Sequence, residues 1–169
     1  MQMRRWRWGL SLLAAFAAGA ATGYAFHMYD VDQHRIIAGV ENVRLVEGNI
    51  GFRARVDTGA AISSVNARDI TVVGGDDAHI LNNIGKPIRF TLVNAQGQTA
   101  TVQSTVAKIY SVRTGDCREW RYHVYLTVEF RGIKTRVLVN LNDRSRAPER
   151  MLLGRDWLVG GYLVDVAAK

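Results

Sequence analysis

The sequence predicts an all-β domain with one short helix near its C-terminus. Three observations favour this fold class: short segments in which apolar and polar residues alternate, turn sequences between them, and only two prolines in 169 residues. Many short strands joined by hairpin turns form a barrel or a sandwich. The helix is expected at 155–160, and a second short helical turn around 67–69.

The alternation places the individual strands. Over residues 52–56, apolar side chains alternate with Arg53 and Arg55, which is typical of a strand with one buried face. Turn sequences at 94–98 and 131–132 separate neighbouring strands. Strands are expected over 52–56, 88–92, 99–110, 122–130, 133–141 and 162–166.

The N-terminal segment 1–29 is expected to be a signal anchor or a signal peptide. Residues 9–26 are uncharged and follow three arginines, and as a helix they would span about 27 Å, close to the thickness of a bilayer core. We favour an uncleaved single-pass anchor in the inner (cytoplasmic) membrane; the alternative is cleavage near Ala20. A linker over 30–37 then leads to a domain over 38–169 outside the cytoplasm, in the periplasm of a Gram-negative cell.

The charge gives little support to nucleic-acid binding. The chain has 22 basic and 15 acidic residues, a formal net charge of +7, but Arg4, Arg5 and Arg7 precede the apolar segment. The other basic residues form no stripe interleaved with aromatics, so we expect no nucleic-acid partner. A mildly basic surface favours anionic substrates or a membrane surface. Cys117 is the single cysteine, which excludes a disulfide within the chain.

The tetrad Asp57-Thr58-Gly59-Ala60 is the most informative stretch of the chain. It follows an alternating strand and precedes the apolar and small residues of 62–65. A turn of this kind presents one carboxylate, and its glycine lets two such turns approach where a Cβ would clash. Thr58 can hydrogen-bond across such a pair, and Ala60 is small enough to pack beneath the site. The tripeptide alone is also an ordinary turn sequence.

Peptide hydrolysis by carboxylates needs two acids around one water. One acid is ionised and activates the water, and the other is protonated and polarises the carbonyl group. Because the chain has one such tetrad, the simplest source of the second carboxylate is a twofold homodimer in which each subunit contributes Asp57. Asp143 is the alternative second acid within one chain.

The sequence resembles the retropepsin-like aspartic peptidases over about residues 38–167. More narrowly, it is similar to a bacterial family with the traditional name ATP-dependent zinc protease, often associated with RimK-type ligases. The resemblance implies a closed retropepsin-like acid-protease barrel, Asp57 as the catalytic acid, dimerisation, and a peptide or protein substrate. It rests on RARVDTGAAISSV at 53–65, NLNDRS at 140–145, LLGRDWL at 152–158 and LVDV at 163–166, and the chain departs from the family pattern at 146–150.

The resemblance also implies supporting residues around Asp57. Asp143 and Arg144 are expected to brace the active-site turn or to contact substrate; the alternative is an Asp-capped turn with a surface arginine. Gly154 ends an apolar strand that leads into the short helix. Arg155 is expected to pair with a carboxylate at a subunit contact.

A retropepsin also needs a flap that covers the substrate and excludes water. We expect the flap at 113–119, because a charged loop with a glycine suits a mobile lid. The turn at 94–98 is the competing candidate. The residues expected at the flap are Thr114, Gly115, Asp116 and Cys117.

No metal and no nucleotide cofactor is expected. The four histidines are widely separated without a His-Glu-x-x-His motif, and the chain has no Gly-rich loop that ends in Lys-Ser/Thr. The leading hypothesis is a membrane-tethered, extracytoplasmic aspartic endopeptidase. The alternative is a non-catalytic dimeric β module that binds peptide or cell-envelope material, and a metal-dependent hydrolase is a weaker third.

Overall fold

The computed structural model describes residues 35–114, 117–159 and 161–168. Strands dominate these residues, with one short 3-10 helix and one short α-helix. Along the chain the elements are β1 (Arg35–Ala38), β2 (Val40–Leu45), β3 (Ile50–Val56), β4 (Ser63–Val72), η1 (Ile80–Asn83), β5 (Pro87–Val93), β6 (Thr99–Thr105), β7 (Lys108–Thr114), β8 (Cys117–Phe130), β9 (Ile133–Asn142), β10 (Met151–Leu153), α2 (Arg155–Leu158) and β11 (Tyr162–Asp165).

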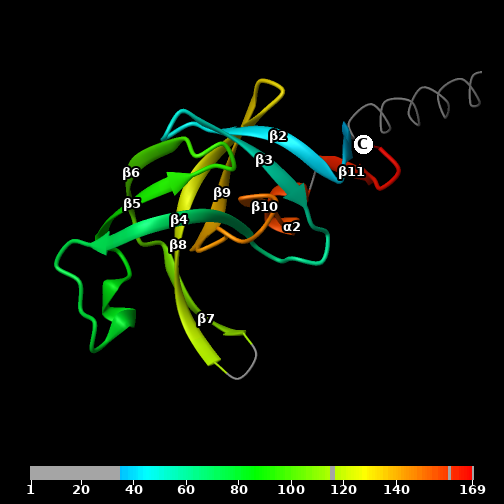
Figure 1. Cartoon of the computed structure of the whole chain (residues 1–169). Coiled ribbons are helices and arrows are strands. Elements are labelled where there is room, and N and C mark those ends of the chain that lie inside the picture. Colours follow the sequence, from blue (N-terminus) through cyan, green and yellow to red (C-terminus); the bar gives the residue numbers. More distant parts are fainter. Residues whose placement is uncertain (1–34, 115–116, 160, 169) are drawn as a thin grey trace, which may run out of the picture.

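Six strands close into a barrel (Figure 1). They lie in the order β10-β3-β2-β8-β9-β4, and β10 also pairs with β4, which completes the ring. β5 and β6 extend the sheet beyond β4, and β7 pairs with β8 outside the ring. The predicted closed all-β barrel with one short α-helix is therefore confirmed.

The barrel interior is filled by alternate residues of its strands. In β3, Ile50, Phe52, Ala54 and Val56 are buried, and the residues between them are exposed. Burial of a large apolar side chain contributes about 1.5–3 kcal/mol. Because a slip of one residue would turn every arginine of β3 into the core, this pattern fixes the register of the strand.

β10 lies between the two strands that flank the acid-bearing turn. It pairs parallel with β3, where Leu153 is opposite Val56, and antiparallel with β4, where Met151 is opposite Val65. The chain enters α2 directly after this short strand. This arrangement places the Gly-Arg-Asp sequence that follows β10 beside the turn after β3.

A separate two-stranded sheet joins the two ends of the domain. β1 pairs parallel with β11, with Ile36 opposite Leu163. Residues 35–37 of the expected linker thus belong to a strand. The rest of that linker and the expected signal segment 1–29 lie outside the described residues. The part of the chain that the structure describes contains no helix with the length and hydropathy of a membrane span.

Two expectations for secondary structure are wrong in detail. The helical turn expected around 67–69 lies in β4, where Asp69 has φ of 54° at a shift in the pairing with β5. Asp69 adopts a left-handed conformation at an irregularity within the strand. A polar residue of this kind is also typical of turns, which explains the wrong prediction. The stretch 99–110 divides into β6 and β7, because the chain leaves one hairpin and enters the next.

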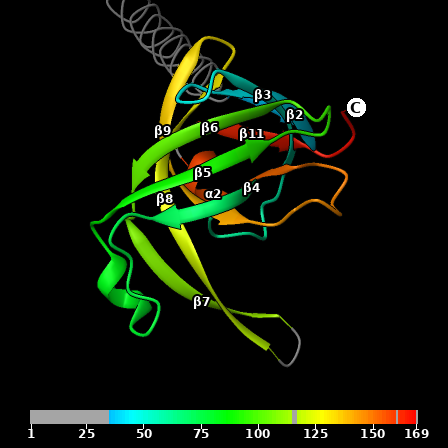
Figure 2. The same ribbon diagram turned by 60° about the vertical axis from the view of Figure 1, so that its left-hand side comes forward.

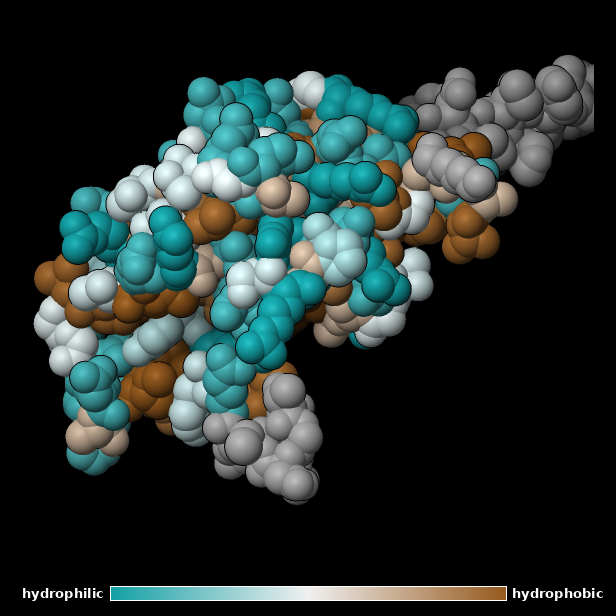
Figure 3. Space-filling view, in the orientation of Figure 1, coloured by the Kyte–Doolittle hydropathy of each residue, from teal (hydrophilic) through white to brown (hydrophobic). Residues whose placement is uncertain are grey.

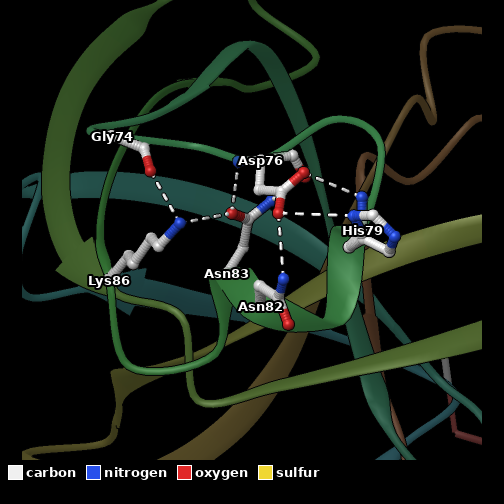
Figure 4. Close-up of polar contacts among 6 residues, drawn as sticks. All are labelled: Gly74, Asp76, His79, Asn82, Asn83 and Lys86. Carbon is white, nitrogen blue, oxygen red and sulfur yellow. Dashed lines mark hydrogen bonds and ion pairs between the residues drawn. The ribbon is translucent and has the colours of Figure 1, made fainter.

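The segment between β4 and β5 is held together by side-chain hydrogen bonds. Asp76 accepts one from the backbone N of His79 and one from Nδ2 of Asn82, at 2.8 and 2.9 Å (Figure 4). The buried Asn83 accepts from the backbone N of Asp76 at 2.7 Å and from Nζ of Lys86 at 3.1 Å. Periodicity does not predict η1, because polar contacts rather than an apolar face stabilise it.

The hydrogen bonds of Asp76 favour its charged form. The side chain of Asn82 and the backbone N–H of His79 hold the pKa of Asp76 below its ordinary value. Since the folded-state pKa is lower than that of the unfolded chain, the contribution of Asp76 to stability is complete above the unfolded pKa. It is lost as the pH falls through the lowered value.

Candidate active site

The acid turn, residues 57–62, joins β3 to β4. The backbone N of Asp57 donates to the carbonyl of Leu153 in β10 at 2.9 Å. Oδ1 of Asp57 accepts from the backbone N–H groups of Gly59 and Ala60 at 2.9 and 3.2 Å. The turn itself thus orients the carboxylate, while Asp57 stays partly exposed and Gly59 is exposed.

Gly154 brings β10 and α2 into direct contact with the acid turn. A Cβ at this position would lie 2.8 Å from the carbonyl carbon of Ile62 and 3.0 Å from the carbonyl oxygen of Ala60. The next residue, Arg155, donates its backbone N–H to that same Ala60 oxygen at 2.9 Å. Only glycine fits this approach without a displacement of the backbone.

Ser63 and Asp156 lock the far end of the acid turn. Oγ of Ser63 donates to Oδ1 of Asp156 at 2.8 Å and accepts from the backbone N of Gly154 at 3.0 Å. Asp156 also accepts the backbone N–H of Ser63 at 3.0 Å and that of Trp157 at 3.0 Å. The carboxylate sits in the first turn of α2, where negative charge is favoured. Sequence reasoning assigned no role to Asp156, although an acid just inside a helix start is the available signal.

The side chain of Arg155 braces the tip of the turn. Its Nη1 donates to the carbonyl oxygens of Thr58 and Gly59 at 3.1 and 2.9 Å. We expected a carboxylate partner for this arginine, whereas its side-chain hydrogen bonds among the described residues go to backbone carbonyls. Its place at a subunit contact stays a prediction.

Asp143 and Arg144 lie in the loop that follows β9. Oδ1 of Asp143 accepts the backbone N–H of Ser145 at 2.8 Å, and the hydrogen bonds of Ser145 hold the pKa of Asp143 below its ordinary value. Asp143 therefore caps its own turn. The backbone N of Arg144 donates to Oδ1 of the buried Asn66 in β4 at 2.8 Å, which ties this loop to the barrel.

The guanidinium of Arg144 lies within electrostatic reach of Asp57. Burial lowers the pKa of Arg144, and the positive charge of Arg55 lowers it further. Glu149 raises this pKa, and Arg121 lowers it. The carboxylate of Asp57 also raises it. The pKa of Arg144 thus responds to the charge of Asp57, and its role as a brace or a substrate contact stays a prediction.

The hairpin of β7 and β8 carries the residues expected at the flap. Thr114 is opposite Cys117 at the last described pair, while Gly115 and Asp116 lie outside the described residues. Figures 1 and 2 show the hairpin projecting from the barrel.

The competing turn at 94–98 is fastened to the barrel. Asn94 is buried, and its Nδ2 donates to the carbonyl of Gly51 in β3 at 2.9 Å. Its Oδ1 accepts the backbone N–H groups of Gln96 and Gln98 at 3.1 and 2.9 Å. A turn fixed in this way is a poor lid, which favours the β7–β8 hairpin as the flap.

Histidine and carboxylate side chains do not form a metal centre in the described ranges. There, no three His, Cys, Asp or Glu side chains gather as ligands. His123 is buried in β8, with Nδ1 at 3.0 Å from the carbonyl of Arg121, and burial lowers its pKa. His79 has Asp76 as its ion-pair partner, with Nδ1 at 3.7 Å from Oδ2.

The comparisons with known proteins agree with this geometry. Residues 37–169 match the model of the RimB-like family, described as retropepsin-like aspartic endopeptidase RimB. The chain belongs to this family. The matched residues include the acid turn, β10 and α2, so the predicted resemblance is confirmed.

Two proteins are similar to this chain in structure or in sequence. A crystal structure of a Legionella pneumophila protein of unknown function aligns with a TM-score of 0.63 and 27% identity, over 79% of this chain and 95% of that chain. A probable alpha-L-glutamate ligase of Parasynechococcus marenigrum (strain WH8102) is 31% identical over 115 residues. That match covers 68% of this chain and 24% of the ligase, so the chain spans about a quarter of the relative's length.

Replacement of Gly154 by alanine should destabilise the domain. The new methyl group would overlap backbone atoms of the acid turn, and overpacking of this kind costs about 1–3 kcal/mol. Urea unfolding of the full chain measures the change. Gly39→Ala is the matched control, because a Cβ at that position would have no atom within 4 Å and its φ is not left-handed. Equal stability of the two variants would contradict the close contact between Gly154 and the acid turn.

Proposed function

We propose that this protein is a membrane-tethered aspartic endopeptidase that acts outside the cytoplasm as a homodimer. One observation supports the chemistry most directly: the carboxylate of Asp57 is oriented by two N–H groups of its own turn and is accessible at the surface. Membership of the RimB-like family supports the reaction class. The basic and then apolar segment 1–29 supports the tether.

The proposed reaction uses one Asp57 from each subunit. The ionised carboxylate takes a proton from the water as the water oxygen bonds to the carbonyl carbon, and the protonated carboxyl gives its proton to the carbonyl oxygen. The tetrahedral intermediate then breaks its C–N bond: the newly protonated carboxyl gives its proton to the leaving nitrogen, and the newly ionised carboxylate takes a proton from one hydroxyl of the intermediate. Because the pair must share one proton, activity should peak on the acid side of neutrality and fall on both sides.

The β1–β11 sheet is the proposed dimer surface. Ile36 and Leu163 are opposite one another and are 62% and 53% exposed. Val159 and Val166 flank β11 and are also exposed. Figure 3 shows hydrophobic residues, coloured brown, exposed at this end of the molecule. Strand edges and apolar side chains that face solvent favour pairing with another chain, and a second copy would cover both.

An acidic peptide is the proposed substrate class. Arg55 lies two residues before Asp57, and Arg155 donates to carbonyls of the acid turn. The positive charges of Arg55 and Arg121 also lower the pKa of Arg144. A basic surface attracts anionic substrates. The relative from Parasynechococcus is named a probable alpha-L-glutamate ligase, which supports glutamate-containing peptides as substrates. A further arginine, Arg150, donates to the carbonyl of Arg144 at 2.7 Å.

The Asp57→Asn variant should lose peptide cleavage by at least about 10²-fold while it keeps its fold and its oligomeric state. Cleavage of a proteome-derived peptide mixture, read by mass spectrometry, measures the loss. Asp69→Asn, at an exposed acid of β4, is the control and should cleave normally. A chelator should not change the rate. If Asp57→Asn cleaves as well as the parent, the reaction is wrong, and peptide binding without turnover in the parent would indicate a binding module.

The Leu163→Arg substitution should both dissociate the proposed dimer and abolish cleavage. A charged side chain on the exposed face of β11 cannot be buried against a second copy without a large desolvation cost. Sedimentation of the full chain in detergent measures the mass. Leu81→Arg, which changes an exposed leucine of η1, should leave both properties unchanged. A monomeric Leu163→Arg protein with full activity would refute the dimeric mechanism.

A further inference from the structure

The β7–β8 hairpin leaves the barrel where β8 loses its pairing with β9. The last residue of β8 in that pairing is His123, which lies opposite Asn140. Beyond it, residues 117–122 of β8 pair only with β7 among the described strands. A two-stranded ribbon by itself is at best marginally stable in water. The direction in which this hairpin projects in Figure 2 therefore depends on the contacts at its base.

The segment between β4 and β5, residues 73–86, is longer than the connection of these two strands needs. The strands are antiparallel neighbours, and Val72 at the end of β4 lies opposite Ile88 at the start of β5. A turn of about two to five residues joins such a pair in most hairpins. The chain uses fourteen residues here, and includes η1 among them. The extra length therefore has a use other than the reversal of the chain.

The end of the segment 73–86 is bonded to the base of the hairpin. Val106, just before β7, accepts the backbone N–H of Gly85 at 2.8 Å and donates its own to the carbonyl of Lys86 at 3.0 Å. The residue after Val106 donates its backbone N–H to the carbonyl of His123 at 2.8 Å. These backbone hydrogen bonds join the segment to the start of β7 and, through it, to β8.

Asn83 adds a side-chain bond from the same segment to β8. Its Nδ2 donates to Oη of Tyr122 at 3.1 Å and to the carbonyl of Asp76 at 3.1 Å. Its Oδ1 accepts from the backbone N of Asp76 and from Nζ of Lys86 (Figure 4). The side chain is fully buried, and both donors and both acceptor sites of its amide are in use. Since an amide with four partners has one orientation, Asn83 holds the Tyr122 hydroxyl at a defined place.

Tyr122 is on the face of the hairpin that continues the barrel core. It lies opposite the buried Ile109 of β7 and packs against the core cluster. Trp120, two residues along β8, belongs to the same face and is 42% exposed. On this face the support by the core thus diminishes beyond Tyr122. The bond from Asn83 is therefore placed where the hairpin passes from the supported to the projecting part.

We propose that Asn83 and Tyr122 are positioning residues, and that their hydrogen bond sets the direction in which the proposed flap projects from the barrel. Neither side chain takes part in bond making or breaking. The effect on cleavage rests on the proposed function, in which a flap holds substrate against the acid turn. The effect on the hairpin does not, because its opening can be measured without substrate.

The Tyr122→Phe variant tests the hairpin itself. It removes only the hydroxyl that Asn83 contacts and keeps the ring. Hydrogen exchange of the full chain in detergent, without substrate, should be severalfold faster at 108–114 and 117–122 and unchanged in β3. Tyr125→Phe is the matched control, because it removes a hydroxyl from an exposed tyrosine of the same strand. Its hairpin should exchange as in the parent.

Cleavage kinetics separate a positioning role from a merely structural one. The substrate is a fluorogenic form of the peptide that the parent cleaves fastest in the mixture used for Asp57→Asn. With Tyr122→Phe, KM should rise about threefold to tenfold, the factor that one ordinary hydrogen bond supplies, while kcat stays within about twofold. Saturating substrate itself favours the positioned hairpin, which preserves kcat. A structural loss would reduce the folded fraction, so that kcat falls and KM stays the same.

Asp76→Asn loosens the segment without a direct change to the hairpin. The carboxylate accepts from the backbone N of His79 and from the amide of Asn82, both within the segment 73–86. The variant should raise exchange in that segment and, to a smaller extent, in the hairpin. Faster exchange in the segment with an unchanged hairpin would mean that the segment does not position the flap.

Three further outcomes would overturn the proposal: unchanged hairpin exchange in Tyr122→Phe, an equal increase in Tyr125→Phe, or a lower kcat at unchanged KM in Tyr122→Phe. Failure of the proposed function has a different signature. A parent protein that cleaves no peptide refutes the peptidase, and the exchange measurements still decide whether Asn83 and Tyr122 position the hairpin.

Discussion

The close approach of β10 and α2 to the acid turn is the constraint on which the rest of the structure depends. Gly154 permits the contact, since any side chain there would overlap the carbonyl groups of the turn. The hydroxyl of Ser63 then bonds to both the Gly154 N–H and the carboxylate of Asp156. These bonds hold the turn at the barrel surface, so that Asp57 is fixed in direction yet remains accessible. A carboxylate in that position is available to a second copy of the chain.

Strands that bury one face could be predicted from the sequence, because alternation alone defines them. β3 is the clearest case, with arginines between core residues. β4 shows why others could not: its first five residues are buried on both faces, so no alternation remains. β1 was equally hidden, because its partner β11 lies more than a hundred residues away and the burial of its own four residues does not alternate. Contacts that tertiary structure decides leave no local signal.

The candidate site divides in the same way. Asp57, Gly154 and Arg155 could be predicted because each belongs to a short contiguous motif. The buried polar pair of Ser64 and Asn140 could not, since the two residues are opposite one another only through the parallel register of β4 and β9. The hydrogen bonds of Arg155 to carbonyl oxygens were also hidden, because backbone acceptors have no signature in a sequence. The sequence therefore predicts the residues of contiguous motifs, whereas contacts between distant segments need the structure.

The central claim is that two Asp57 carboxylates from different subunits share one water. Mixed dimers test it most directly: the parent and the Asp57→Asn protein are unfolded together in varied ratios, refolded, and assayed for cleavage. If both carboxylates are required, only dimers of two parent chains are active, and an equal mixture retains about one quarter of the parent activity. Retention of about one half would mean that each subunit works with its own acid, and the account would be contradicted.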